Sequence, residues 1–264
     1  MTDRERAVAF LRETYRRRVE RVEAYPWGEI VMTPSLPRVY DANFAIVDRW
    51  DGDVVELRNE IDRVQHEHDF EHRKVVVPDE ELAARLWRDL DQLDWPLRHR
   101  SLLMVHSRVP DRPADASIEV LAVGEVDWAQ GRRAQIEIEV YVSDPEVVRQ
   151  LLELDRRLAA AMDVRHLAAR VSGEIASYAG LYLDDGVAQV EDVATLPAYR
   201  RQGLASAIVL HAVAEARRSG AELVFLVADE SDSPKELYGR LGFDPIGVSS
   251  TSSADLPHAI PEVP

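Results

Sequence analysis

The clearest pattern of apolar and polar positions lies between residues 187 and 243. β-branched residues at positions 187, 190, 193 and 195 predict a strand, and Pro197 ends it. A helix is predicted after Gly203, because apolar residues recur there at helical spacing: Leu204, Ile208, Val209, Ala212, Val213 and Ala216. The apolar run 223–227 predicts a second strand, so this stretch has the order strand, turn, helix, strand.

The rest of the chain alternates between the same two spacings. In the first half we predict helices over 3–24 (ending at Pro26), over 53–70 and from Pro78 onward, and strands over 27–33, 39–47, 73–77 and 102–106. In the second half we predict strands over 117–123, 164–171 and 174–183 and a helix over 145–162. Residues 135–142 alternate with the period of a strand. The serine-rich segment after Gly247 predicts a poor last strand or a free end, with disorder past Pro257.

The turn before the helix at 204 has the features of an anion site. Arg200 and Arg201 precede Gly203, at a point where a helix begins with unpaired backbone N–H groups. The positive end of the helix dipole adds to the two guanidinium groups. These features together suit a phosphate or pyrophosphate. The alternative is an ordinary strand–helix–strand crossover with a surface arginine pair.

This stretch resembles the GNAT acetyltransferases. Arg200-x-x-Gly203-x-Ala205 fits the family's Arg/Gln-x-x-Gly-x-Gly/Ala pattern, and Leu237-Tyr238-x-x-Leu241-Gly242-Phe243 is similar to its later helix and strand. The resemblance implies an α/β (α+β) fold, the GNAT fold, with a central mixed, mostly antiparallel sheet flanked by helices. It also implies acetyl-CoA as co-substrate. The family has helices where residues 135–142 alternate, and both interpretations of that segment stay open.

The resemblance assigns roles to individual residues. Cofactor-binding positions are Val193, Ala194 and Thr195 along the pantetheine arm, Arg200, Arg201, Gln202, Gly203, Leu204 and Ala205 at the pyrophosphate, and Ser231, where the family commonly has asparagine. Tyr238 matches the tyrosine that protonates the departing thiolate. Glu191 is the expected general base and Asp192 the second choice. Adjacent strand residues face opposite sides, so only one is expected to reach the amine, and a water chain is a further alternative.

The first half resembles a degenerate copy of the same unit. Residues 25–108 repeat the order of elements weakly, but they lack the cofactor pattern, and Trp87 stands where the tyrosine would be. The proline-bearing linker 109–115 marks the expected boundary. We therefore predict two tandem units, with a degenerate domain over 1–115, an acetyltransferase domain over 116–248 and a Ser/Pro-rich tail over 249–264.

Composition narrows the partners. The 264 residues contain no cysteine and carry a net charge of −16, of which −11 falls after residue 115. Such acidity disfavours nucleic acid and would attract a cationic amine, although it can serve solubility alone. No apolar run reaches the length of a membrane span, so we expect a cytoplasmic protein without a membrane partner. His68 and His72 at helical spacing suggest a metal, but a polar helix end is favoured and no metal is predicted.

Three functions follow. The first is an acetyl-CoA-dependent N-acetyltransferase acting on a primary amine of a small molecule or peptide. The second is a non-catalytic acyl-CoA-binding or scaffolding protein, since Ser231 and Pro234 depart from the family pattern. The third is a specialised acyltransferase of the mycothiol-synthase type, because tandem GNAT proteins include that activity. The sequence leaves open the acceptor and whether the protein is a monomer or a homodimer.

Overall fold

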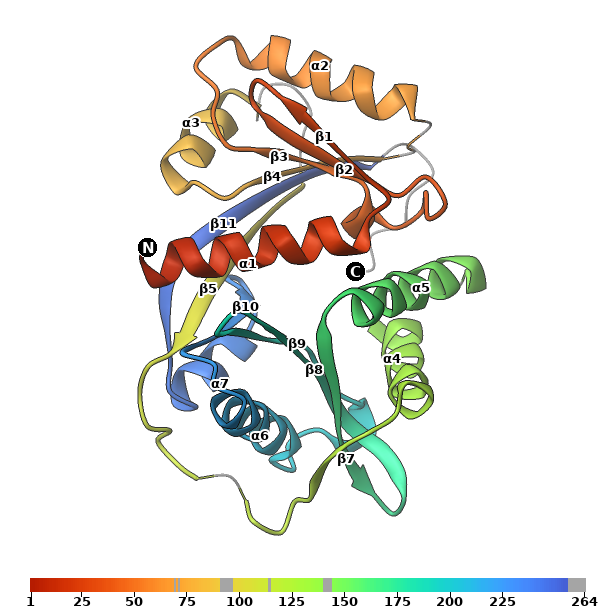
Figure 1. Cartoon of the computed structure of the whole chain (residues 1–264), viewed down its shortest axis with the longest axis vertical. Coiled ribbons are helices and arrows are strands. Elements are labelled where there is room, and N and C mark those ends of the chain that lie inside the picture. Colours follow the sequence, from red (N-terminus) through yellow and green to blue (C-terminus); the bar gives the residue numbers. More distant parts are fainter. Residues whose placement is uncertain (69, 71, 91–96, 114, 140–143, 256–264) are drawn as a thin grey trace. The chain divides into compact units, whose positions relative to one another are not determined.

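The chain forms two compact units in a computed structural model that describes residues 1–68, 70, 72–90, 97–113, 115–139 and 144–255 (Figure 1). The larger unit comprises Met1–Leu11 and Leu102–Ile246, and the smaller comprises Arg12–Ser101 and Gly247–Pro264. Helix α1 (Asp3–Arg18) and strands β5 (Leu97–His106) and β11 (Phe243–Asp255) each contribute residues to both units. The units are thus interleaved along the chain, and the boundary at 115/116 stays a prediction.

A mixed sheet forms the centre of the larger unit. Its strands follow the order β5, β10, β9, β8, β7, β6. Their bounds are β6 (Val120–Ala122), β7 (Asp163–Val171), β8 (Glu174–Asp184), β9 (Val187–Thr195) and β10 (Leu223–Asp229). Strands β9 and β10 are parallel, whereas β6, β7, β8 and β9 pair antiparallel in succession. The predicted mixed, mostly antiparallel sheet flanked by helices is confirmed.

Helices cover both faces of this sheet (Figure 1). On one face, α6 (Leu204–Arg218) and α7 (Pro234–Arg240) pack through Ile208, Ala212 and Tyr238. On the other, α4 (Glu125–Glu139) and α5 (Pro145–Ala161) pack through residues such as Trp128 and Leu152. The start of α1 packs on this second face as well, next to the strand residues of a separate cluster. The two helical layers leave the sheet buried on both sides, which explains its continuous apolar strands.

The smaller unit contains parallel and antiparallel strands and two helices. Its strands are β1 (Arg21–Tyr25), β2 (Gly28–Met32), β3 (Phe44–Val47), β4 (His72–Val77) and the end of β11. Helices α2 (Val54–Glu67) and α3 (Glu80–Leu90) pack on one face of these strands. A short 3₁₀ helix is formed by Tyr40–Ala42. Strands β3 and β4 are parallel with α2 between them, the same strand–helix–strand order as β9, α6 and β10. A second tandem unit of this topology agrees with the prediction.

The serine-rich segment is an ordered strand. Residues 250–255 pair antiparallel with β4, with Ser250 opposite Val77 and Ser252 opposite Val75. Both serine side chains are buried. Serine has low strand propensity, so the sequence alone predicts a tail from residue 249, and the pairing with β4 is what makes these residues a strand. The segment past Pro257 that was expected to be disordered lies outside the described residues.

One other predicted element differs in the structure, and one segment whose pattern fits either a strand or a helix is helical where the structure describes it. The helix over 3–24 ends at Arg18, because the chain turns into the β1–β2 hairpin, with Arg21 opposite Met32. Residues 135–139 belong to α4 and not to a strand, since buried Ile136 packs against α5. The alternation of apolar residues over 135–142 is too short to distinguish a strand from a helix, and residues 140–142 lie outside the described residues.

The histidine pair that suggested a metal is not on one helix. Helix α2 ends at Glu67, and His72 belongs to strand β4. The His72 side chain is buried, its Nε2 lies 2.7 Å from the Asn43 carbonyl oxygen, and its ring stacks on Tyr40. His72 is therefore a core residue of the smaller unit.

Candidate active site

Strand β9 carries a β-bulge beside strand β8. The register between the strands shifts between Tyr178 and Gly180, so two residues of β9 stand opposite Ala179. Asp192 lies at this point with φ 52°, in the left-handed region that few residues other than glycine adopt. A bulge of this kind redirects side chains and locally interrupts the alternation of a strand.

The bulge places two carboxylates on one face of the sheet. On the N-terminal side of the bulge, Val190 packs against α6, so Glu191 faces the opposite side of the sheet. Tyr182 belongs to the cluster on that opposite face. Alternation would carry Asp192 to the α6 face, but Val193 packs there instead. The Tyr182 hydroxyl donates a hydrogen bond of 3.2 Å to Asp192 Oδ2. Asp192 thus shares a face with Glu191, and the prediction that the two face opposite sides is wrong, because the bulge adds one residue.

An arginine from α4 joins this face. Arg132 Nη2 lies 3.0 Å from Asp192 Oδ1, and Arg132 Nε lies 3.3 Å from Asp155 Oδ2 on α5. The exposed fraction of the side chain is 21% for Arg132, 13% for Asp192 and 12% for Asp155. The ion pairs are therefore mostly shielded from water. Burial alone lowers the pKa of Arg132, but Asp192 and Asp155 outweigh it and hold that pKa above its usual value.

Glu191 lies within electrostatic reach of two tyrosines. Its carboxylate accepts a hydrogen bond from Gln189 Nε2. The pKa of Tyr182 is raised well above its usual value by burial first, and then by Asp192, Asp155 and Glu191. Burial and then Glu191 also raise the pKa of Tyr238. Of the predicted catalytic residues, Glu191 is therefore the one that influences both the bulge cluster and Tyr238.

Tyr238 sits on α7 with its ring largely buried. Its side chain packs against Phe243 with ring centroids 6.3 Å apart, and the residue is 8% exposed. Burial, followed by the charges of Glu191 and Asp232, raises its pKa to about 12. The phenol is therefore protonated throughout the physiological pH range and can act as a proton donor.

The turn from residue 200 to the start of α6 presents free backbone donors. The first hydrogen bond at this helix end runs from Ala207 N–H to the Gly203 carbonyl at 3.0 Å. The N–H groups of Leu204, Ala205 and Ser206 therefore have no acceptor within the helix. Gly203 caps the helix at φ 82° without a side-chain hydrogen bond, and Arg201 also has a positive φ of 61°. Such a turn suits an anion because the donors converge at the positive end of the helix dipole.

The end of β9 is tied to this turn. Arg200 Nε donates to the Thr195 carbonyl at 3.1 Å, which fixes the spacing between strand and turn. Ser177 Oγ donates to the Ala194 carbonyl at 2.7 Å and lies 2.9 Å from Thr195 Oγ1. The Arg200–Thr195 hydrogen bond thus joins the predicted pantetheine positions Val193–Thr195 to the predicted pyrophosphate positions 200–205.

Ser231 has a local role. Its N–H and its hydroxyl both donate to Asp229 Oδ1, at 2.7 and 2.6 Å. These bonds stabilise the turn between β10 (Leu223–Asp229) and α7. The predicted cofactor contact of Ser231 has no support from this arrangement, and it stays a prediction.

The equivalent turn of the smaller unit has the opposite chemistry. Between β3 and α2 the chain reads Asp48-Arg49-Trp50-Asp51-Gly52-Asp53, with three carboxylates and one arginine that donates to the Pro26 carbonyl. Asp53 accepts a 2.6 Å hydrogen bond from Val55 N–H, so its carboxylate covers the end of α2. A negative side chain at a helix start excludes a phosphate there. These residues agree with a first unit that has lost the cofactor turn.

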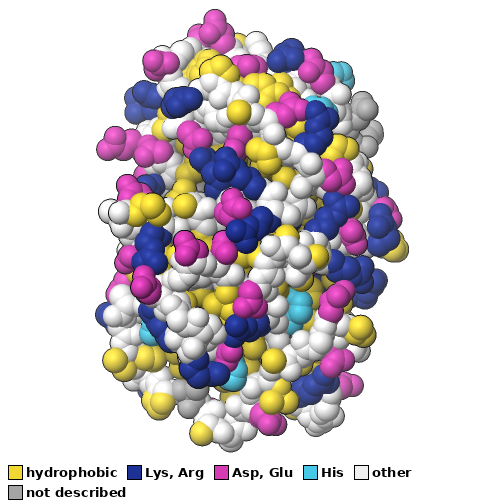
Figure 2. Space-filling view, in the orientation of Figure 1, with side chains coloured by type: hydrophobic (Ala, Val, Ile, Leu, Met, Phe, Trp, Pro, Cys, Tyr) yellow, Lys and Arg dark blue, Asp and Glu magenta, His cyan; other side chains and the backbone are white. Residues whose placement is uncertain are grey.

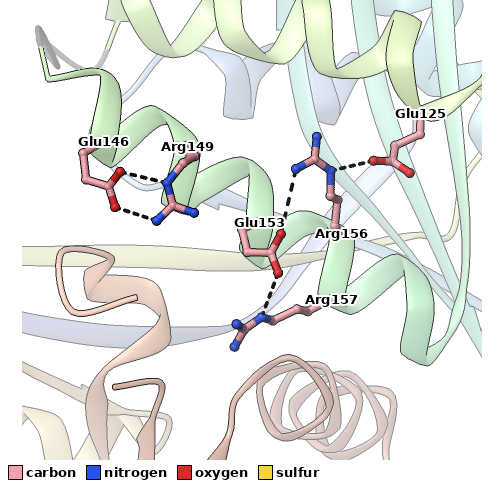
Figure 3. Close-up of polar contacts among 6 residues, drawn as sticks. All are labelled: Glu125, Glu146, Arg149, Glu153, Arg156 and Arg157. Atoms are coloured by element: carbon pink, nitrogen blue, oxygen red, sulfur yellow. Dashed lines mark hydrogen bonds and ion pairs between the residues drawn. The ribbon is translucent and has the colours of Figure 1, made fainter. Parts of the chain in front are cut away.

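The face of the molecule drawn in Figure 2 carries charges of both signs. Acidic and basic side chains are interspersed on the face drawn in Figure 2. Along α5, Glu146 pairs with Arg149, Glu153 lies between Arg156 and Arg157, and Arg156 reaches Glu125 of α4 at 2.7 Å (Figure 3). Ion pairs as exposed as these contribute little to stability.

Each helix in the described part of the chain is too short or too polar to cross a membrane.

Sequence reasoning missed the helical contribution to this site. Arg132 and Asp155 lie 23 positions apart, and Arg132 stands three residues before the segment 135–142, whose pattern fits either a strand or a helix. Their meeting depends on α4 and α5 packing on the same sheet face. The signal that could have identified Arg132 and Asp155 is a charge at a helix position that faces the core, since buried charges are rare unless they are paired.

A family model matches part of the larger unit. Residues 128–243 match the model of the Acetyltransferase (GNAT) family. The fold is similar to a functionally unknown conserved protein from Staphylococcus epidermidis ATCC 12228, with TM-score 0.67 and 15% identity over 90% of this chain and 94% of that one. A GCN5-related N-acetyltransferase from Kribbella flavida has TM-score 0.65 and 19% identity over 95% and 94%.

The tandem arrangement also has a solved counterpart. A tandem GNAT protein from the clavulanic acid biosynthesis pathway has TM-score 0.54 and 15% identity, covering 78% of this chain and 70% of that chain. No curated protein matches the sequence. At these identities the structural likenesses establish the fold, and the chemistry has to be argued from the residues themselves.

Proposed function

We propose that the protein, whose residues 128–243 form a domain of the acetyltransferase (GNAT) family, transfers the acetyl group of acetyl-CoA to a primary amine. The observation that carries this proposal is the turn at 200–205, where three free N–H groups and two left-handed residues meet at the start of α6. That arrangement fits the pyrophosphate of coenzyme A. The matching turn of the smaller unit is closed by Asp53, so we assign the cofactor to the larger unit only.

The proposed reaction needs a base for the amine and an acid for the departing thiolate. Bound acetyl-CoA supplies the activated acyl group as a thioester. Glu191, or Asp192 beside it, accepts a proton from the amine, since only the neutral amine has a free electron pair for attack. Tyr238 donates its phenolic proton to the sulfur as the carbon–sulfur bond breaks. As the carbon–nitrogen bond forms, the nitrogen loses its second proton, which replaces the proton that the phenol gave to sulfur. The proton on the carboxylate passes to solvent, so the reaction releases one proton overall.

The acid–base assignment is supported by the electrostatics. The raised pKa of Tyr238 keeps its proton available, and it shares with Tyr182 the influence of the Glu191 carboxylate. Glu191 is the better candidate base of the two carboxylates, because Asp192 is already engaged by Arg132 and Tyr182. We place the reaction in the cytoplasm and the acceptor among small-molecule or peptide amines, with a monomer or a homodimer both compatible.

Calorimetry with acetyl-CoA tests the cofactor site. The intact protein should bind it, and Arg201→Glu should weaken binding at least tenfold, on the order of 1.4 kcal/mol. Arg149→Glu is the matched control, because it makes the same charge change on the exposed face of α5 (Figure 3). Absence of binding, or equal loss in both variants, would count against the assignment.

Release of free thiol separates the enzyme from a binding protein. The intact protein is supplied with acetyl-CoA and a panel of putrescine, lysine, glucosamine and a peptide with a free amino terminus. Amine-dependent release supports the transferase. Saturable binding with no release on any amine favours the non-catalytic acyl-CoA-binding alternative, which the locally engaged Ser231 also allows. A specialised acyltransferase of the mycothiol-synthase type rests only on the tandem layout, and release confined to an amino sugar would favour it.

A further inference from the structure

We infer that Arg132 is a positioning residue that holds the β9 bulge in place and thereby sets where Glu191 points and how readily it accepts a proton. This inference rests on the proposed transferase function, but its first test does not depend on activity. Arg132 comes from α4, outside the strand and the turn that carry the family pattern.

The first step is the geometry of the clamp. Arg132 uses separate nitrogens for its two partners, Nη2 for Asp192 at 3.0 Å and Nε for Asp155 at 3.3 Å. Asp192 is itself the left-handed residue of the bulge, and its other oxygen accepts from the Tyr182 hydroxyl. Both carboxylate oxygens of a strained residue are therefore held, one from a helix and one from the neighbouring strand. Without the guanidinium, Asp192 loses one of the two side-chain partners that offset the conformational cost of its backbone.

The second step is the neighbourhood of Glu191. Glu191 directly precedes Asp192, so a change in the bulge backbone moves its side chain. The charges of four residues act on the pKa of the Tyr182 hydroxyl: Asp192, Asp155, Glu191 and Arg132. Three carboxylates thus lie within electrostatic reach of the Arg132 guanidinium and of one another. Removing that positive charge leaves the carboxylates to repel one another, which makes proton uptake by Glu191 easier.

The groups around Asp192 come from every element packed against it. They are Arg132 of α4, Asp155 of α5, His166 of β7, Tyr178 and Tyr182 of β8, and Glu191 of β9. The pKa of His166 is lowered by burial, so this imidazole is neutral at pH 7 and adds no positive charge there. Arg132 is the cation that pairs with Asp192.

The chain offers a matched control. Arg156 also links α4 and α5, through Glu125 at 2.7 Å, but on the exposed side of the helices (Figure 3). Arg156→Met removes an arginine between the same two helices without touching the bulge. Arg132→Lys keeps the charge but loses the second nitrogen, so it separates the role of charge from that of the forked geometry.

Hydrogen exchange of the peptide containing residues 189–196 gives the first test. In Arg132→Met, exchange of this peptide should be about tenfold faster than in the unaltered protein, with Arg132→Lys in between and Arg156→Met unchanged. Equal protection in Arg132→Met and Arg156→Met overturns the inference. This outcome is decided even if the protein proves to bind acyl-CoA without transferring it.

The pH profile of amine-dependent thiol release gives the second test. With the best amine of the panel, the acidic limb should move up by about one unit in Arg132→Met and much less in Arg132→Lys. Maximal rate should fall while the dissociation constant for acetyl-CoA stays the same, because the turn at 200–205 is untouched. A variant that merely loses folded protein would scale the whole profile without moving its limb, and that result refutes the positioning role. If Arg132→Met does not fold, Asp155→Asn and Arg132→Lys must show the same ordered effects, or the inference fails.

Discussion

Removing the Tyr238 hydroxyl tests the proton donor directly. A pKa of about 12 lies two units above the ordinary value for tyrosine, so about one phenol in a thousand is ionised at pH 9, compared with about one in ten without the shift. Tyr238→Phe keeps the ring that packs against Phe243. We expect the maximal rate to fall about 10²- to 10³-fold, with folding and acetyl-CoA affinity preserved.

The assay is amine-dependent release of thiol from pH 6.5 to 10, for the unaltered protein and Tyr238→Phe. Because the phenol stays protonated over this range, the ratio of the two rates should be constant. Tyr25→Phe is the control, since burial and then Glu23 raise the pKa of Tyr25 to about 12 as well, but Tyr25 belongs to the smaller unit. A ratio that falls as the pH approaches 10, as a phenol with the ordinary pKa would give, or full activity in Tyr238→Phe, would refute the reasoning.

Three further predictions concern other parts of the molecule. Burial lowers the pKa of His72 to about 4, so the folded state binds a proton at this residue less tightly than the unfolded state does. The free energy of unfolding should therefore fall by about 3 kcal/mol as the pH drops from above 6.5 to below 4. Urea unfolding at pH 7 and 4.5 measures this, and an equal pH dependence in His72→Phe would contradict it. Gly203→Val places a branched side chain at φ 82°, with its Cβ 3.4 Å from Ile118 Cδ1, and should weaken acetyl-CoA binding about tenfold or more in calorimetry; unchanged affinity would argue against the turn. Glu191→Gln should reduce thiol release about 10²-fold without changing acetyl-CoA affinity, whereas an undiminished rate would shift the role of base to Asp192 or water.

The sequence predicts those parts of the fold that local pattern controls. The strand at 187–195, the helix after Gly203 and the mixed sheet follow from spacing, from one glycine and from the resemblance that these residues carry. The turn could be recognised because its chemistry lies within six consecutive residues, 200–205. Local patterns were also enough to place most helices and strands within a few residues of their observed ends.

What the sequence could not predict depends on distant partners. The serine strand exists because β4 offers an unpaired edge, and serine itself carries no strand signal. The bulge at Asp192 is a matter of register with β8, which a strand pattern cannot show. Arg132 reaches this bulge only after two helices and two strands have assembled. For that reason the facing of Glu191 and Asp192 was predicted wrongly, although both residues were identified as candidates.

The account depends above all on the backbone donors at the start of α6, and calorimetry with acetyl-CoA on the intact protein and on Arg201→Glu addresses them most directly. We predict saturable binding by the intact protein, at least tenfold weaker binding by Arg201→Glu, and unchanged binding by Arg149→Glu. A protein that fails to bind acetyl-CoA, or that binds it equally well in all three forms, would contradict the central claim.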